Sequence, residues 1–247
     1  MKVLIGDTGL VGGVLQEQTQ FDATFNSSNI EDLPRQCPEI KQLYLACLPA
    51  TKWLINKNAS HDLANAINIV SILQSVKIWE VVLYSTIDVY QDSPAGVDER
   101  FLPSFSGVNY GSNRLIFEQL IQHGLPNSKV KVIRLPALFH RSIKKNVLYD
   151  LLNDNCLEQA NVNSAYQWYP LNKLWRDTEK APFAITNLFP PPIETQSIVE
   201  RFFPGKRLWE GPRVVYNFCT KYSITGYLYD QQIILQLMEE FINEVRS

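Results

Sequence analysis

The chain has 247 residues, of which 45% are hydrophobic and 19% are charged, so it can bury the core of one large domain with a small appendage. Its formal net charge of −2 gives no reason to expect nucleic acid or an anionic membrane as a partner. The 4 cysteines include no Cys-x-x-Cys pair, and no apolar run approaches the about 18 residues of a membrane span. We therefore expect a cytoplasmic protein with reduced thiols.

Short apolar segments alternate with segments of helical periodicity along the chain. The expected strands are residues 2–5, 23–25, 42–46, 79–84, 129–134 and 183–187, and the expected helices include residues 12–20, 61–75 and 111–123. This alternation predicts an α/β fold, a Rossmann-type doubly wound parallel sheet, over residues 1–190, with part of the substrate side at 140–180. Residues 191–247 are expected to form a small, trimmed C-terminal extension on the substrate side. Its last helix, 230–245, is expected to use Ile233, Leu237 and Phe241 as one face.

Glycines recur at positions 6, 9 and 12, directly after the first apolar run. A strand that turns sharply into a helix needs glycine at the turn, where a pyrophosphate approaches the backbone, and where helix packs on strand. The free N–H groups of the new helix then point at the phosphates. The spacing therefore predicts a dinucleotide site, although glycines also serve ordinary turns.

A second cluster is Tyr110 and Arg114, four residues apart on one face of an expected helix. A fixed cation beside a tyrosine stabilises the phenolate, which lets the side chain exchange a proton with a carbinol or carbonyl oxygen. Thr86, near the end of an expected strand, could donate a hydrogen bond to the same oxygen. The alternative is that Tyr110 is a core residue and Arg114 a solvated one.

These segments, in this order, resemble the extended short-chain dehydrogenases/reductases of the NAD-dependent epimerase/dehydratase type. The matching segments are residues 6–12, 44–49, 84–90, 133–137 and 187–195, with Asp62 and Asn65 on the helix after the second of them. The resemblance covers about the first 190 residues and implies a hydride transfer between a nicotinamide and a carbinol carbon, with Thr86, Tyr110 and Arg114 as the catalytic residues. The implied cofactor-binding residues are Gly6, Thr8, Gly9, Leu10, Val11, Gly12, Asn26, Ser27, Ala46, Cys47, Pro49, Ser85 and Pro136.

The sequence departs from the family at three points. Position 114 is arginine where the family has lysine, and arginine cannot take part in a proton relay. Ala137 stands where many members that act on nucleotide sugars have asparagine, and no arginine that would clamp a sugar diphosphate is evident near residues 166–169. These departures concern the sugar nucleotide more than the cofactor.

The choice between NAD and NADP depends on the end of the second strand, where NAD-preferring members carry an acid. Here the sequence is Phe25-Asn-Ser-Ser-Asn29, with no carboxylate to repel a 2′-phosphate. We therefore expect NAD(P) with a slight preference for NADP, although the same residues suit a plain polar turn.

On the expected substrate side, Lys145 and Asn146 could hold a phosphate or carboxylate, and Gln167 and Tyr169 could line a pocket. The alternatives are a solvated basic turn and an aromatic core. Asp88 and Glu99 are isolated in the sequence, and the 3 histidines share no metal-ligand spacing, so we expect no metal.

The leading hypothesis is an NAD(P)-dependent oxidoreductase or epimerase, acting on a sugar-like substrate that could be a nucleotide sugar. The alternative is a non-catalytic dinucleotide-binding regulator or assembly partner. A homodimer would suit the family; neither nucleic acid nor a membrane is expected as a partner.

Overall fold

The computed structural model describes residues 1–105 and 107–247, and they divide into two compact units. The first unit comprises residues 1–93, 101–134 and 174–187, and the second comprises 94–100, 135–173 and 188–247. The second unit is therefore assembled from three stretches of the chain, not from residues 191–247 alone. Within the part of the chain that the structure describes, no helix is long and apolar enough to cross a membrane.

The first unit is built on a parallel sheet of six strands in the order β2-β1-β3-β4-β5-β8. The strands are β1 (Lys2–Ile5), β2 (Ala23–Phe25), β3 (Glu39–Leu45), β4 (Lys77–Thr86), β5 (Lys129–Leu135) and β8 (Ile185–Asn187). Their centres are continuous apolar runs, such as Val81–Leu83, because helices bury both faces of the sheet. The predicted parallel α/β sheet is confirmed.

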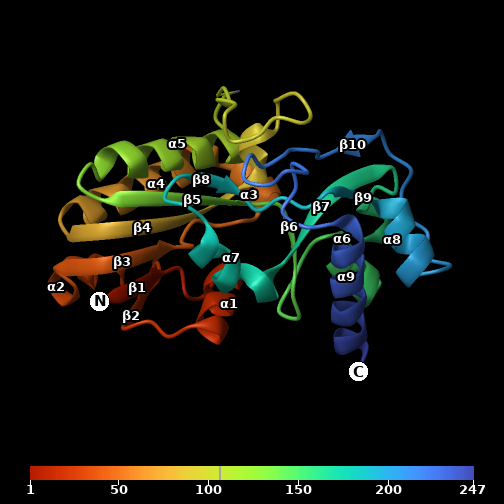
Figure 1. The fold of residues 1–247 in the computed structure, drawn as a ribbon, viewed down its shortest axis with the longest axis horizontal. Coiled ribbons are helices and arrows are strands. Elements are labelled where there is room, and N and C mark those ends of the chain that lie inside the picture. The colour runs from red at the N-terminus through yellow and green to blue at the C-terminus, as the bar shows by residue number, and fades with distance from the viewer. Residues whose placement is uncertain (106) are drawn as a thin grey trace. The chain divides into compact units, whose positions relative to one another are not determined.

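Helices cover the two faces of this sheet (Figure 1), with α4 and α5 side by side on one face and α1 and α7 on the other. The helices are α1 (Leu10–Gln18), α2 (Leu33–Gln36), α3 (Lys52–Lys57), α4 (Ala59–Gln74), α5 (Tyr110–Gly124) and α7 (Leu174–Lys180). A buried ion pair between Arg134 and Glu118, 2.6 Å apart, ties α5 to β5. Ser85 at the end of β4 donates to the same carboxylate at 2.5 Å, so α5 is fixed at the edge where the strands end.

The strand order reverses between β1 and β3, since β2 lies on one side of β1 and all the other strands lie on the opposite side. Ligands of open α/β sheets bind outside the carboxyl ends of the strands at such a reversal. In this chain the glycine loop follows β1, and residues 46–49 follow β3. The fold therefore brings these two segments to one ligand-binding edge.

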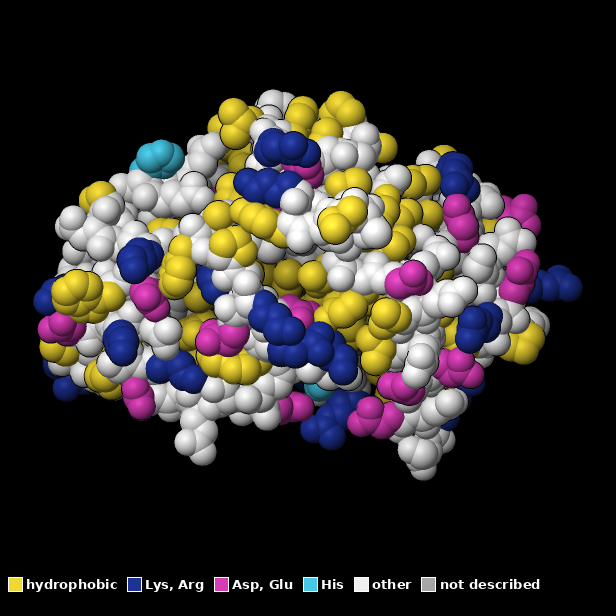
Figure 2. Space-filling model, viewed as in Figure 1, with side chains coloured by type: hydrophobic (Ala, Val, Ile, Leu, Met, Phe, Trp, Pro, Cys, Tyr) yellow, Lys and Arg dark blue, Asp and Glu magenta, His cyan; other side chains and the backbone are white. Residues whose placement is uncertain are grey.

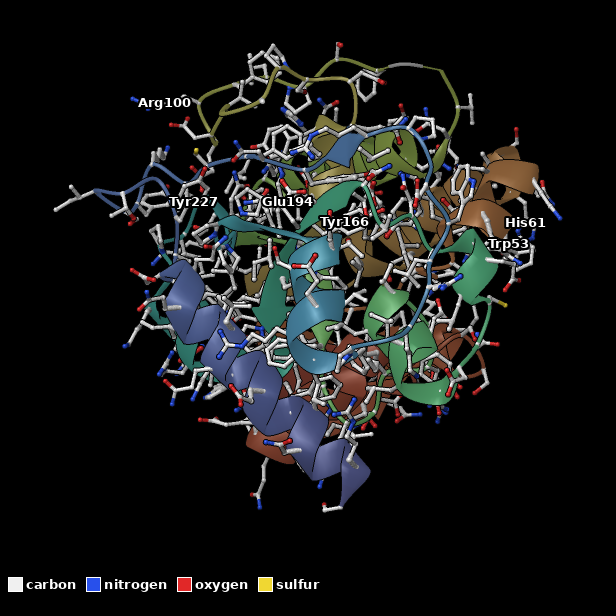
Figure 3. All side chains as sticks on the ribbon, turned by 90° about the vertical axis from the view of Figure 1, so that its right-hand side faces the viewer. Trp53, His61, Arg100, Tyr166, Glu194 and Tyr227 are labelled. Atoms are coloured by element: carbon white, nitrogen blue, oxygen red, sulfur yellow. The ribbon has the colours of Figure 1, made fainter. Side chains whose placement is uncertain are left out.

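The second unit contains a sheet of strands in the order β10-β7-β6, and β9 pairs with β7 antiparallel. Its elements are β6 (Ala137–Phe139), α6 (Val147–Asn153), β7 (Ser164–Pro170), β9 (Pro192–Glu194), α8 (Thr195–Phe202), β10 (Val214–Val215) and α9 (Gln231–Arg246). Tyr166 and Glu194, labelled in Figure 3, belong to the paired strands β7 and β9. The predicted face of the last helix is wrong in part: Ile233 is 47% exposed, and α9 instead buries Ile234 and Met238 together with Phe241.

Charged side chains of both signs are mixed over most of the face shown in Figure 2, and hydrophobic ones gather at its upper edge. The segment that leads into α5 accounts for part of this apolar surface, since Leu102 is 86% exposed and Val108 is 58% exposed.

Candidate active site

The glycine loop makes a tight turn between β1 and α1. Gly6 has φ of 101°, and a Cβ on it would lie 2.2 Å from the carbonyl oxygen of Ala46. A Cβ on Gly12 would lie 2.1 Å from the carbonyl oxygen of Gly6. Both glycines are therefore required by close backbone packing.

Gly9 differs from the other two glycines of the loop. It has ordinary extended backbone angles, with φ −81° and ψ 166°, and a Cβ on it would meet its nearest neighbour at 3.5 Å. Gly9 is exposed and is the N-cap of α1, and no side chain caps the helix. The packing of the protein leaves room for a Cβ at this position. A phosphate that approaches the open N-terminus of the helix would instead be obstructed by a side chain there, which accounts for the glycine. The loop therefore fits the pyrophosphate of a dinucleotide.

The other expected residues of the loop lie along the same turn and the start of α1. Thr8 is exposed, and Leu10 and Val11 are half-buried in the first turn of the helix. Across from them, Ala46 and Cys47 follow β3, with the backbone of both close to Gly6. Burial raises the pKa of the Cys47 thiol to about 12, so Cys47 is protonated at neutral pH.

The turn after β2 is a hydrogen-bonded polar turn, as the alternative interpretation of its sequence expected. The Asn26 N–H donates to Asn29 Oδ1 at 2.8 Å, and the Ser28 N–H donates to Asn26 Oδ1 at 2.9 Å; Ser27 between them is exposed. Asn26 Nδ2 donates to Asp7 Oδ1 at 3.1 Å. Residues 25–29 contain no carboxylate, as the sequence shows, but Asp7 of the glycine loop brings one to the end of the second strand.

Tyr110 and Thr86 come together at the start of α5. Asn109 caps this helix, its Oδ1 accepting from the Ser112 N–H at 3.0 Å, and Gly111 allows the backbone to approach Asp88. The side chains of Thr86 and Arg114 lie near the Tyr110 hydroxyl, and both lower the pKa of its phenol. The predicted convergence of Thr86, Tyr110 and Arg114 is thus present in the structure.

Arg114 is not the solvated residue of the alternative interpretation, since it is only 5% exposed. Its Nη1 and Nη2 donate to the two oxygens of Asp62 at 2.8 and 3.1 Å, and Nη2 also donates to the Pro49 carbonyl at 2.5 Å. Its guanidinium carbon lies 4.6 Å from the centre of the Tyr110 ring. The arginine is thus held in a buried, bidentate ion pair and links the tyrosine to the segment beside the glycine loop.

The pKa of the Tyr110 phenol lies above its ordinary value. Burial is the largest cause, Arg114 lowers the pKa, and the nearby carboxylate of Asp88 raises it. At neutral pH the hydroxyl therefore carries its proton, and the side chain is set up to donate one.

The residues expected on the substrate side lie in the second unit, as does Pro136, which lies between β5 and β6. Gln167 is bonded through its whole amide: Nε2 donates to the carbonyls of Pro190 and Phe218, and Oε1 accepts from the Phe218 N–H. Tyr169 is buried, and its ring centre lies 6.4 Å from that of Tyr229, with the two rings tilted by 39°. Both therefore have a structural part within this unit.

Lys145 is exposed, and Asn146 caps α6 through its Oδ1, which accepts from the Tyr149 N–H at 3.0 Å. Asn146 has a backbone φ of 117°, a conformation that residues other than glycine adopt only when the surrounding structure imposes it. Its Nδ2 is also bonded, to the Leu138 carbonyl at 2.8 Å.

Sequence reasoning missed three residues beside these sites, namely Asp7, Lys52 and Asp88. Asp88 is two residues after Thr86. Its N–H donates to the Thr86 hydroxyl, which in turn donates to the Asp88 carboxylate. Lys52 Nζ lies 2.7 Å from Asp88 Oδ1. The family segment around Thr86 pointed to this place, but an isolated aspartate carried no signal of its own.

No family model matches the sequence, and a search of the curated proteins finds no match. Solved structures do match. UDP-glucose 4-epimerase from Thermotoga maritima superposes with a TM-score of 0.76 at 11% identity, over 100% of both chains. UDP-glucuronic acid 4-epimerase from Bacillus cereus gives 0.76 at 15% identity, over 100% of this chain and 99% of that one.

A dTDP-4-dehydrorhamnose reductase from Clostridium acetobutylicum gives a TM-score of 0.72 at 14% identity, over 100% of both chains. These matches extend across the whole chain, including the second unit. The chain therefore has the same fold as these epimerases and this reductase.

Proposed function

We propose that this chain is an NAD-dependent oxidoreductase or epimerase that transfers a hydride to or from a carbon of the sugar in a nucleotide sugar. One observation carries the proposal: a continuous chain of contacts joins the glycine loop to Tyr110. Gly6 packs on Ala46, the Pro49 carbonyl accepts from Arg114, and the Arg114 guanidinium lies 4.6 Å from the centre of the Tyr110 ring, with Thr86 beside the phenol. A phosphate site and a proton donor therefore share one edge of the sheet.

The substrate class comes from the structural neighbours. One of these epimerases was solved with UDP-glucose and another with UDP-glucuronic acid and NAD, and the reductase acts on dTDP-4-dehydrorhamnose. Fold likeness alone does not transfer an activity, so the proposal also depends on the Thr86–Tyr110 geometry.

Each side chain has a definite part in this proposal. When bound, the nicotinamide supplies or accepts the hydride. The N–H groups at the start of α1 hold the pyrophosphate, and Thr86 orients the reacting oxygen of the sugar. Tyr110 donates a proton to that oxygen as a carbonyl is reduced, or takes it back in the reverse direction. Because Tyr110 is protonated at neutral pH, the resting side chain can donate its proton in the reductive direction, whereas oxidation first requires that it lose that proton.

We propose NAD over NADP because of Asp7. NAD-binding members of this fold use a carboxylate at the end of the second strand to bond the 2′-hydroxyl of the adenosine ribose. Asn26 holds the carboxylate of Asp7 at that place, 3.1 Å away. A 2′-phosphate at this place would lie beside the like charge of the Asp7 carboxylate. At a separation of about 4 Å this repulsion costs about 1–4 kcal/mol.

The cofactor part is tested by binding, without any substrate. NADH is expected to bind more tightly than NADPH, and Asp7→Asn is expected to shrink that ratio at least about tenfold, the equivalent of about 1.4 kcal/mol. Asp32→Asn is the control, because it removes the same charge from an exposed ion pair with Arg35. An unchanged ratio in Asp7→Asn would remove Asp7 from the selection of the cofactor.

The catalytic part is tested with a panel of UDP- and dTDP-linked sugars and 4-ketosugars, following NADH consumption for reduction and interconversion of the sugar epimers for epimerisation, which consumes no net cofactor. Turnover is expected on at least one of them and is expected to be lost in Tyr110→Phe, while NADH affinity is retained. Activity that persists in Tyr110→Phe contradicts the assigned role of the tyrosine.

One observation favours a second candidate, a non-catalytic dinucleotide-binding regulator. The guanidinium of Arg114 is bonded to Asp62 and Pro49, whereas the family lysine holds the nicotinamide ribose. This candidate predicts cofactor binding without turnover on any sugar of the panel, together with a cofactor-dependent change in affinity for a partner protein.

A further inference from the structure

Two ion pairs flank Tyr110, and they differ in burial. The Arg114–Asp62 pair is closed off, with side chains 5% and 4% exposed. The Lys52–Asp88 pair is more open, since Lys52 is 37% exposed and Asp88 is 15% exposed. Each pair has one member close to the phenol, which is a cation in the first pair and an anion in the second.

Asp88 is fixed against the catalytic residues. Its N–H donates to Thr86 Oγ1 at 3.2 Å, and that hydroxyl donates to Asp88 Oδ2 at 3.3 Å. Gly111 packs so closely on the Asp88 carbonyl that a Cβ would lie 2.3 Å from it. The backbone of Asp88 is therefore fixed against the start of α5, and its carboxylate is held by the hydroxyl of Thr86 and by Lys52.

An anion fixed beside a proton donor opposes formation of the phenolate. The charged groups around the phenol are Arg114 on α5, Asp62 on α4 behind it, Asp88 after β4, and Lys52 on α3. Asp62 binds both nitrogens of the Arg114 fork and offsets its charge. The balance at Tyr110 therefore depends on whether the charge of Asp88 is offset as well.

Lys52 supplies that offset from a helix that is itself anchored at Tyr110. Lys52 Nζ lies 2.7 Å from Asp88 Oδ1, and Asn56, one turn later on α3, accepts from the Tyr110 N–H at 2.8 Å. Trp53 and Leu54 between them are 63% and 54% exposed, and Trp53 lies at the edge of the molecule in Figure 3. Thus α3 directs Lys52 and Asn56 to the site, whereas Trp53 and Leu54 are exposed.

We propose that Lys52 is a positioning residue for the proposed reaction: by neutralising Asp88, it offsets the negative charge that would otherwise oppose ionisation of Tyr110. The inference rests on the proposed role of Tyr110 as the acid and base. In this chain the arginine at 114 lowers the pKa of Tyr110 while paired with Asp62, and the lysine on α3 adds to that effect by offsetting the charge of Asp88. Lys52 acts through Asp88 and need not touch the substrate.

The test is the ionisation of position 110 in the apo protein. Tyr110 is replaced by 3,5-difluorotyrosine, whose more acidic phenol titrates in an accessible pH range, and is followed by ¹⁹F NMR. Lys52→Met is expected to raise the phenol pKa by about one unit, because it leaves the charge of Asp88 uncompensated. Asp88→Asn is expected to lower it by a similar amount, and the double variant is expected to return near the parent value.

The controls separate charge from structure. Lys57→Met removes the same charge from the same helix, where Lys57 Nζ lies 4.8 Å from the Trp53 ring centre, and is expected to leave the phenol pKa unchanged. Lys52→Arg restores the charge and is expected to restore the parent pKa. Thermal melting of each variant shows that it is folded, and Asp88→Asn, which keeps the shape of the side chain, stands as the test if Lys52→Met does not fold.

Shifts of the same sign in Lys52→Met and Asp88→Asn, or no shift in either, would overturn the inference, because a purely structural clamp predicts one of those results. Failure of the proposed function is distinguished from failure of this inference by a different measurement. It appears as absent NADH binding or absent turnover in the parent protein, and the inference then loses its role in a reaction even if the opposite shifts are seen.

Discussion

The glycine loop and the Tyr110 site lie at the same edge of the sheet, but they keep to the family pattern to different degrees. The loop is made of backbone groups, and a Cβ added to Gly6 or Gly12 would come within 2.2 or 2.1 Å of a backbone carbonyl oxygen. The Tyr110 site is made of side chains, and its cation is an arginine paired with Asp62. The shape of a site that is made by backbone packing follows directly from the fold. In a site made by side-chain charges, different charged residues can surround the same tyrosine without a change of fold.

The largest expected effect comes from breaking the buried pair in the Tyr110 site. Asp62→Ala leaves the guanidinium of Arg114 buried without its carboxylate, and we expect it to lower the free energy of unfolding by about 3–5 kcal/mol. Urea denaturation measures the loss. Asp32→Ala, which breaks an exposed pair with Arg35, is the control and is expected to cost less than about 1 kcal/mol. Equal losses in the two variants would show that Arg114 is not buried in the way described.

The glycines of the loop provide the next test. Gly12→Ala is expected to destabilise the protein by about 2–4 kcal/mol, because its Cβ would meet the Gly6 carbonyl oxygen. Gly9→Ala is expected to leave stability within about 1 kcal/mol of the parent. It is nevertheless expected to weaken NADH binding at least about tenfold, since the methyl group occupies the approach of the pyrophosphate. If Gly9→Ala binds NADH normally, the loop is an ordinary turn.

The pH dependence of turnover gives a smaller effect that separates the two directions of reaction. Tyr110 must be protonated to reduce a carbonyl, and its pKa is raised above the ordinary value of about 10. The kcat/KM for reduction is therefore expected to stay constant through neutral pH, as far as Tyr110 controls it, and to fall only above about pH 10. Oxidation, which needs the phenolate, is expected to rise over the same range. Measurement of kcat/KM in both directions checks this, and a fall in reduction that begins near neutral pH would contradict it.

Much of the first unit could be predicted from the sequence because its signals are local. The apolar run before Gly6, the spacing of the three glycines, and the Tyr110–Arg114 spacing each depend on fewer than a dozen consecutive residues. The position of Thr86 at the end of β4 also followed from its own segment. Local patterns of this kind specify a strand end, a turn or a helix face directly.

The features that could not be predicted all depend on residues far apart in the chain. Asp62 meets Arg114 across 52 positions, Asp7 meets Asn26 across 19, and Lys52 meets Asp88 across 36. The face of α9 was misplaced by one residue for a related reason, because the strand on which it packs decides which side is buried. Side-chain pairing between helices and loops is set by tertiary packing, which single-sequence periodicity does not carry.

The central claim is that the loop at Gly6–Gly12 binds a nicotinamide dinucleotide, and a fluorescence titration of the unmodified protein with NADH and then NADPH tests it most directly. Saturable NADH binding at sub-millimolar concentration, tighter than that of NADPH, is the expected result. The absence of binding by either cofactor at that concentration would contradict the claim and leave the Thr86–Tyr110 geometry without a hydride to serve.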